Sequence, residues 1–185
     1  MIMTKQNILD KVIISAVNKN NVKDGTVYLN WNDLALTFKF EVCDGGYVTI
    51  NETLMSQLGI SIEELVKVAS RNMDIDIVNM SELFDVFTPF GSIDITIVTN
   101  KEKMYGAGTI FKTDVFRDIA NTHGNDLYIL PSSIHEVLII DAITEDVDYL
   151  INMVREINEG FVAPEDRLSD NVYRYWRELD TITMV

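Results

Sequence analysis

The chain has 185 residues, 47% hydrophobic and 24% charged, which suits a folded domain with its own core. Its net charge of −14 makes nucleic acid an unfavourable direct partner, because binding phosphates requires clustered Lys and Arg. The single cysteine, Cys43, excludes an internal disulfide framework and any zinc site with several cysteines. The apolar runs are too short to cross a bilayer, and "MIMTKQNILDKV" lacks a signal-peptide pattern, so we expect a cytoplasmic protein without a membrane segment.

Residues 4–18 predict a helix, because their apolar residues fall on one stripe at helical spacing and Thr4 can cap the start. The stripe consists of Ile8, Leu9, Val12, Ile13, Ala16 and Val17. "LALTFKFEV" (34–42) alternates strictly and predicts a strand with one buried face. "CDGG" then indicates a hairpin turn into a second strand at 47–50.

Two short helices follow. Asn51 can cap the first and Gly59 can end it. Ser61 and Glu64 have the spacing of a capping box, which predicts a second helix that runs to about Asn72. "SELFDVF" (81–87) indicates a further helical turn.

The remaining residues predict a sheet with two more helices. A helix begins at Thr113 and ends near Gly124, and another is capped by Thr144, runs to about Glu159 and has Gly160 past its end. Strands are expected at 93–99, 106–111, 127–130, 136–141 and 173–176. The fold class is therefore α+β, a mixed, mostly antiparallel sheet with helices packed on it. We expect one domain over 1–185, with an N-terminal helix and strand (1–44), a helical segment (45–92) and an α+β core (93–185).

Negative charge is concentrated in residues 136–170, which hold ten Asp or Glu and two Arg. One interpretation is a solvated helix face, since acidic residues also suit the positive N-terminal end of a helix. The other is a surface that docks a basic groove of a partner protein.

"LYILPSSIHEVLI" (127–139) raises the question of catalysis, because Ser132, Ser133 and His135 lie within four positions. A serine nucleophile needs a histidine within hydrogen-bond reach and a third group that orients it, usually from separate segments. No G-x-S-x-G motif is present, and Pro131 with two serines also suits a turn between strands. The stretch is either a polar connection or a hydrolase-like site.

No other motif indicates chemistry. For a metal, the plausible local ligands are His123, Asp126, His135 and Glu136, but they lack the spacing of a known metal motif. No H-E-x-x-H, calcium-loop, G-x-G-x-x-G or P-loop pattern occurs, so we expect neither metal nor cofactor. In "GAG" (106–108) the glycines instead suit a close approach of two backbone segments. The tail "NVYRYWREL" is rich in Tyr, Trp and Arg, which dominate interface hot spots, but the pattern rather favours an edge strand with alternate rings in the core.

Four segments together resemble an uncharacterised domain family of gut Firmicutes and their mobile elements. They are "YVTINETLMSQLGISIEELVKVASRNM", "VTNKEKMYGAGTIF", "LYILPSSIHEVLII" and "MVREINEGFVAPEDRLSDNVYRY", and the resemblance covers roughly 45–177. It implies no established activity and no catalytic residues. The motif positions are Gly106, Pro131, Ser132, Ser133, His135, Glu136, Ser169, Asp170, Tyr173 and Arg174. The "LGISIEEL" and "LSDNVYRY" stretches also resemble a second uncharacterised bacterial family.

These observations favour a non-catalytic acidic protein that binds a basic protein partner. Because the resembled family occurs on mobile elements, the partner expected is a nucleic-acid enzyme, such as a defence nuclease inhibited in the manner of an anti-CRISPR protein. The partner-binding residues expected are Glu145, Asp146, Asp148, Glu156, Glu159, Tyr173, Arg174 and Trp176. One alternative is a hydrolase-like enzyme whose site comprises Ser132, Ser133, His135, Glu136 and Asp170. Another is a homo-oligomer formed by pairing of the terminal strand.

Overall fold

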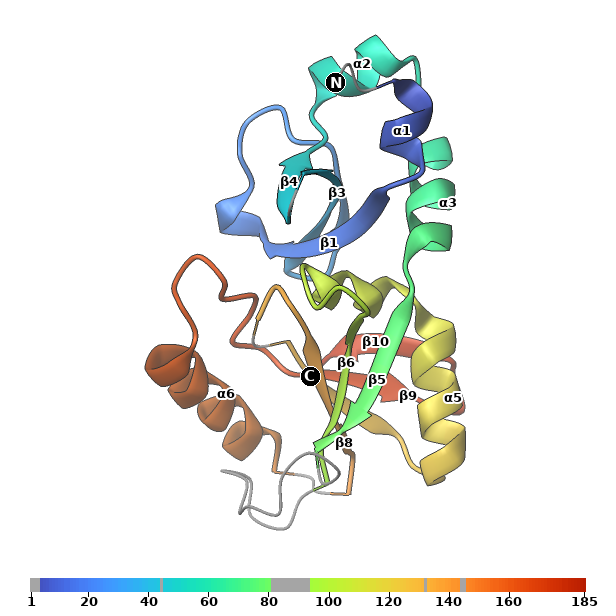
Figure 1. The fold of residues 1–185 in the computed structure, drawn as a ribbon. Helices are drawn as coiled ribbons and strands as arrows, with labels where there is room; N and C mark the ends of the chain where they lie inside the picture. Colours follow the sequence, from blue (N-terminus) through green and yellow to red (C-terminus); the bar gives the residue numbers. More distant parts are fainter. Residues whose placement is uncertain (1–3, 44, 81–93, 132, 144–145) are drawn as a thin grey trace.

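A computed structural model describes residues 4–43, 45–80, 94–131, 133–143 and 146–185. It contains two antiparallel sheets with helices packed around them, so the predicted α+β class is confirmed (Figure 1). The first sheet is built from the N-terminal strands, and α3 leads the chain from it into the second. Among the described residues, no helix is both long enough and apolar enough to cross a membrane.

The first sheet is organised around its longest strand, β3 (Leu34–Cys43). One edge of β3 pairs with β1 (Val12–Asn18), and β2 (Tyr28–Trp31) and β4 (Gly46–Thr49) also pair with β3. The predicted strand and hairpin are confirmed. The expectation of one buried face is wrong for the first half of β3, because Ala35 and Thr37 are buried as well as their apolar neighbours. Both faces of the strand are therefore covered by other parts of the protein over this half.

The helix predicted over residues 4–18 is wrong after Leu9. Helix α1 spans only Lys5–Leu9, and the chain then becomes strand β1. The apolar positions satisfy both periods, but β-branched residues favour a strand, and β1 pairs with β3 over its whole length. The Asn72 side chain donates to the carbonyls of Leu9 and Val12, which fixes the turn between helix and strand.

The two helices predicted next are confirmed, with the expected caps. Helix α2 (Glu52–Leu58) begins at Asn51, whose side chain accepts the Leu54 N–H, and ends at Gly59 in the left-handed region. Helix α3 (Ile62–Asn72) begins at Ser61. The segment 45–92 is not wholly helical, because residues 75–79 form strand β5 (Ile75–Asn79). The turn predicted at 81–87 lies outside the described residues.

The second sheet has the strand order β10-β9-β7-β8-β6-β5. Its described pairings are all antiparallel, and the strands predicted near 93–99, 127–130, 136–141 and 173–176 are confirmed. The bounds are β6 (Thr96–Asn100), β7 (Leu127–Leu130), β8 (Val137–Asp141), β9 (Tyr173–Trp176) and β10 (Thr181–Met184). Strand β9 is not an edge strand, because β10 follows it and pairs with it.

Alternate residues of this sheet face two different cores. Leu127 and Ile129 join a large cluster with Phe116 of α5 (Thr113–His123) and with residues of the first sheet. Tyr128 joins a smaller cluster with Leu150 of α6 (Val147–Phe161). Helix α6 therefore covers one face of the sheet, whereas α5 and the first sheet cover the other (Figure 1).

The strand predicted at 106–111 is wrong, because Gly106–Phe111 forms a 3₁₀ helix, η2. This helix lies between the two sheets, so close to β1 that a Cβ on Gly108 would lie 2.1 Å from the Ile14 carbonyl oxygen. A Cβ on Gly106 would lie 2.5 Å from the His135 carbonyl oxygen. The predicted close approach of backbone segments at "GAG" is therefore confirmed, but within a helix.

Helix α5 ends at Gly124, as predicted. The predicted ends of α6 are wrong, because the helix starts at Val147 with Asp146 as its cap and includes Gly160 in its last turn. Its inner stripe is confirmed, since Leu150 and Val154 are buried and their apolar neighbours on the helix pack against the same cluster.

Candidate functional site

One face of the second sheet is only partly covered by α6. At Tyr128 and Ile140 this face is apolar and packs on the helix. Toward β9 and β10 it carries the polar residues Arg174 and Trp176 instead, while Tyr173 and Tyr175 point to the opposite core. The alternation that marked residues 173–176 thus separates a buried aromatic side from an open polar side.

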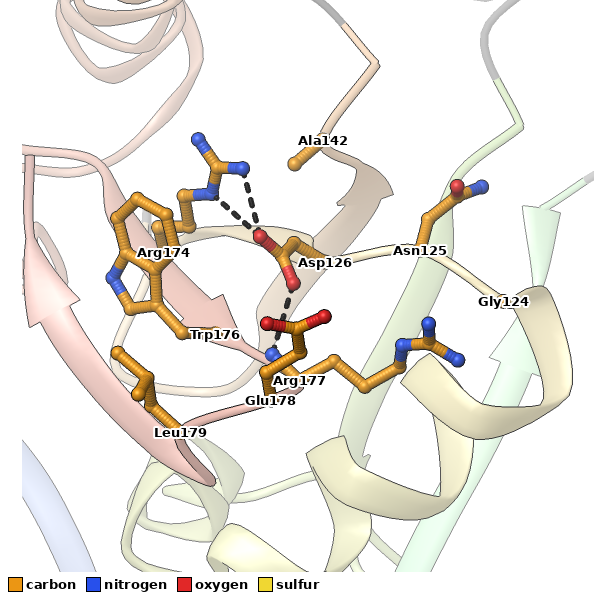
Figure 2. A pocket seen from close by; sticks show the side chains of 9 residues that line it. All are labelled: Gly124, Asn125, Asp126, Ala142, Arg174, Trp176, Arg177, Glu178 and Leu179. Atoms are coloured by element: carbon orange, nitrogen blue, oxygen red, sulfur yellow. Dashed lines mark hydrogen bonds and ion pairs between the residues drawn. The ribbon is translucent and has the colours of Figure 1, made fainter.

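A pocket of about 490 Å³ occupies this open region, within the size range of small-molecule sites (Figure 2). It is formed by the connection from α5 to β7, by Ala142 after β8, by strand β9 and by the β9–β10 turn. Its polar lining residues are Asn125, Asp126, Arg174, Trp176, Arg177 and Glu178.

Asp126 is the central acceptor of the pocket. Its Oδ2 accepts the Arg174 Nη2 at 2.7 Å and the Arg174 Nε at 3.1 Å, and its Oδ1 accepts the Arg177 backbone N–H at 2.9 Å. Burial opposes ionisation of Asp126, but these hydrogen bonds and the two arginine charges outweigh it, so its pKa lies below the ordinary value. The carboxylate is therefore charged at neutral pH and fixes the β9–β10 turn.

The same contacts hold Arg174 in one orientation. Its guanidinium lies 3.9 Å from the centre of the Trp176 ring, a cation–π contact, and 5.7 Å from that of Tyr128. The Trp176 indole N–H donates to the Thr183 hydroxyl at 2.8 Å. Arg174 and Trp176 were predicted as binding residues, and they do lie together at the surface of one pocket.

The predicted acidic residues gather on the outer face of α6. Asp148, Glu156 and Glu159 are exposed there, and their spacing places them along one side of the helix. Asp146 caps the helix through the Tyr149 N–H, and Glu145 lies outside the described residues. A shallow groove of about 300 Å³ lies on this helix, bordered by Glu156 and by Tyr149, Met153 and Phe161 among others.

Tyr173 is fully buried, so in this structure it contributes to the fold and not to the surface. Its hydroxyl donates to Asp33, which also accepts the Ser169 hydroxyl at 2.7 Å and the Asn171 side chain at 2.9 Å. Burial raises the pKa of Asp33, but these three hydrogen bonds outweigh it and lower the pKa. This Asp33 cluster joins the β2–β3 turn of the first sheet to the "LSDNVY" motif.

The alternative site does not form a serine–histidine pair among the described residues. Ser133 accepts the His135 backbone N–H at 2.9 Å, whereas the His135 Nδ1 accepts the Tyr105 N–H at 3.3 Å. Asp170 accepts from Asn158 of α6 at 2.8 Å and borders a pocket that neither Ser133 nor His135 lines. Glu136 is half-buried, and Ser132 lies outside the described residues.

Sequence reasoning missed Asp33 and considered Asp126 only as a metal ligand, whereas Arg177 belongs to the tail rich in Tyr, Trp and Arg that was singled out. A single Asp in a turn carries no signal of its own, because its three partners come from more than 130 residues further along the chain. The metal set considered was His123, His135, Asp126 and Glu136. In the part of the chain that the structure describes, no three His, Cys, Asp or Glu side chains converge as metal ligands would.

The comparisons with known proteins agree with the resemblance. The model of DUF5688, a family of unknown function, matches residues 2–177, so the chain belongs to this family. The match includes residues 2–44, which the resemblance had not covered. No curated protein and no solved structure matches the chain.

Proposed function

We propose that this member of DUF5688 is a non-catalytic binding protein that docks a basic protein partner through the outer face of α6. The observation that carries the proposal is the groove beside exposed aromatic residues on that face. Tyr149 is 57% exposed and Phe161 is 86% exposed, although large aromatic side chains usually gain stability from burial.

The arrangement suits an interface. Aromatic residues are enriched at protein–protein interfaces, Tyr is frequent among the few residues that carry most of the binding energy, and a polar rim surrounds them. Here Glu156 lines the groove, Asp148 and Glu159 are exposed on the same outer face of α6, and the whole chain carries a net charge of −14. Complementary charge therefore favours a basic partner and accelerates its encounter with this face.

The sharper form of the proposal names the class of partner. Enzymes that act on nucleic acids present basic grooves to phosphates, and a row of carboxylates competes for such a groove. The protein would then inhibit a bacterial defence nuclease, as an anti-CRISPR protein does, without binding nucleic acid itself. Its action would be cytoplasmic, where such nucleases work.

The test is a tagged pull-down from nuclease-treated bacterial lysate, over a series of salt concentrations. Three baits are compared: the unchanged protein, the triple variant Asp148→Lys, Glu156→Lys, Glu159→Lys, and the control Asp118→Lys. Asp118 is exposed on α5, which packs on the opposite face of the sheet. We expect the triple variant to lose the partner or to bind it roughly tenfold to a hundredfold more weakly, and the control to retain it.

Inhibition is measured next, with the captured enzyme and its nucleic-acid substrate. The unchanged protein should inhibit cleavage, most strongly at low salt, and the triple variant should not. Equal capture by all three baits would remove the acidic face from the mechanism. A captured partner that does not act on nucleic acid would refute the nuclease as the target, whereas the proposal that the outer face of α6 docks a partner would stand.

Self-association through the terminal strand stays a prediction. Both edges of β9 are paired, with β7 and β10, whereas β10 stands at the end of the described strand order, so β10 is the strand that would pair with a second copy. Sedimentation at high protein concentration tests this prediction.

A further inference from the structure

The pocket beside β9 contains two charged side chains, Arg177 and Glu178, that are not part of its Arg174–Asp126 ion pair. Arg174 and Asp126 neutralise one another through their two hydrogen bonds. Arg177 and Glu178 also line the pocket and are exposed, and within the described part of the chain neither side chain makes a hydrogen bond or an ion pair. One positive and one negative group therefore face the same space.

These two charges stand at separate points of the pocket. Figure 2 shows the Arg177 guanidinium extended toward Gly124, at the end of α5, while the Glu178 carboxylate lies closer to the middle of the view. The turn that carries both residues is anchored, because the Arg177 backbone N–H donates to Asp126 and the turn joins two paired strands. The backbone positions of both charges are therefore set before any ligand arrives.

The charges inside the pocket decide which ligand fits. A free anion would be attracted by Arg177 but repelled by Glu178 and by a chain of net charge −14. A free cation would be attracted by Glu178 and by the net charge of the chain, but it would be repelled by Arg177 and would leave that side chain without a partner. A molecule with one carboxylate and one ammonium is not repelled by the net charge, and it can satisfy both side chains.

We propose that this pocket binds a small zwitterion, a free amino acid or a short peptide, with its carboxylate on Arg177 and its ammonium on Glu178. The Arg174–Trp176 stack forms one wall of the pocket and holds its shape. A volume of about 490 Å³ accommodates a molecule of this size. The inference concerns a different surface from the α6 groove and does not depend on the proposed partner.

The experiment is isothermal titration calorimetry on the full 185-residue chain. The probes are a panel of free L-amino acids and glycylglycine, with acetate and methylammonium as ligands that carry only one of the two charges. The variants are Arg177→Gln and Glu178→Gln. The controls are Arg155→Gln and Glu165→Gln, which change exposed residues outside the pocket.

We expect at least one zwitterion to bind, and acetate and methylammonium to bind far more weakly. Arg177→Gln and Glu178→Gln should each weaken binding by about tenfold to a hundredfold, because each removes a charge-assisted contact, while the controls should not. Binding by amino acids alone, or by glycylglycine alone, identifies which source of the zwitterion fits. Tighter binding of acetate in Glu178→Gln, without binding of any zwitterion, would overturn the proposal, as would no heat from any probe at millimolar concentration.

Discussion

Replacing Gly108 by alanine should destabilise the protein strongly, because η2 lies against the backbone of β1. The new Cβ would be 2.1 Å from the Ile14 oxygen and 2.6 Å from the Ile14 carbonyl carbon, whereas ordinary contact begins at 3.4 Å. Relief requires a backbone shift of about 1.3 Å. Ile14 cannot move freely, because it lies in the middle of β1 and pairs with Phe38 of β3.

Overpacking of a rigid site costs about 1–3 kcal/mol or more, and this contact is backbone against backbone, so we expect a loss of about 3 kcal/mol. That is a large part of the roughly 5–15 kcal/mol by which a domain is stable, and it lowers the melting temperature by about 6–12 °C at this size. Urea denaturation followed by circular dichroism measures the loss, with an unchanged slope as evidence of an unchanged unfolded state.

Gly160→Ala is the matched control. Gly160 lies in the last turn of α6, and a Cβ there would meet nothing within 4 Å. Because glycine weakens a helix relative to alanine, this variant should gain about 0.5–1 kcal/mol. If Gly108→Ala lost less than about 1 kcal/mol in the same assay, the close approach of η2 to β1 would be refuted.

Three further outcomes are expected. Asp33→Asn should lower stability at neutral pH by about 2 kcal/mol and flatten its acid dependence, measured by urea denaturation at several pH values. The sign follows from the lowered pKa: Asp33 contributes stability above about pH 4, which is lost as the pH falls through the folded-state pKa. Arg174→Ala should cost about 1–2 kcal/mol, between the values for exposed and buried pairs, and an unchanged melting curve would contradict the role of its bond to Asp126. Phe161→Ser should leave stability within about 0.5 kcal/mol while reducing capture of the partner, and equal capture would refute the α6 groove.

Local signals in the sequence determined the helices with caps and the strands with alternation. Ser61 and Asn51 mark helix starts that the structure reproduces, because a cap uses only backbone groups three residues away. Strand β3 was also predicted correctly, since its alternation of apolar and other residues spans more than eight positions. The two glycines of "GAG" correctly predicted a close approach of two backbone segments, but they did not show that a 3₁₀ helix makes this approach.

Tertiary structure decided what local patterns left open. The apolar positions of residues 12–18 fit both a helix and a strand, and pairing with β3 selected the strand. Tyr173 is buried and Arg174 only half-buried, because one face of β9 packs into the core shared with the first sheet and the other face is open beyond α6. Asp33 meets Ser169, Asn171 and Tyr173 only because the two sheets pack against each other. The sequence by itself thus determined most local elements and the charge of the protein. Sites that join distant segments depended instead on how those elements pack, because hydrogen bonds between distant segments leave no periodic signal along the chain.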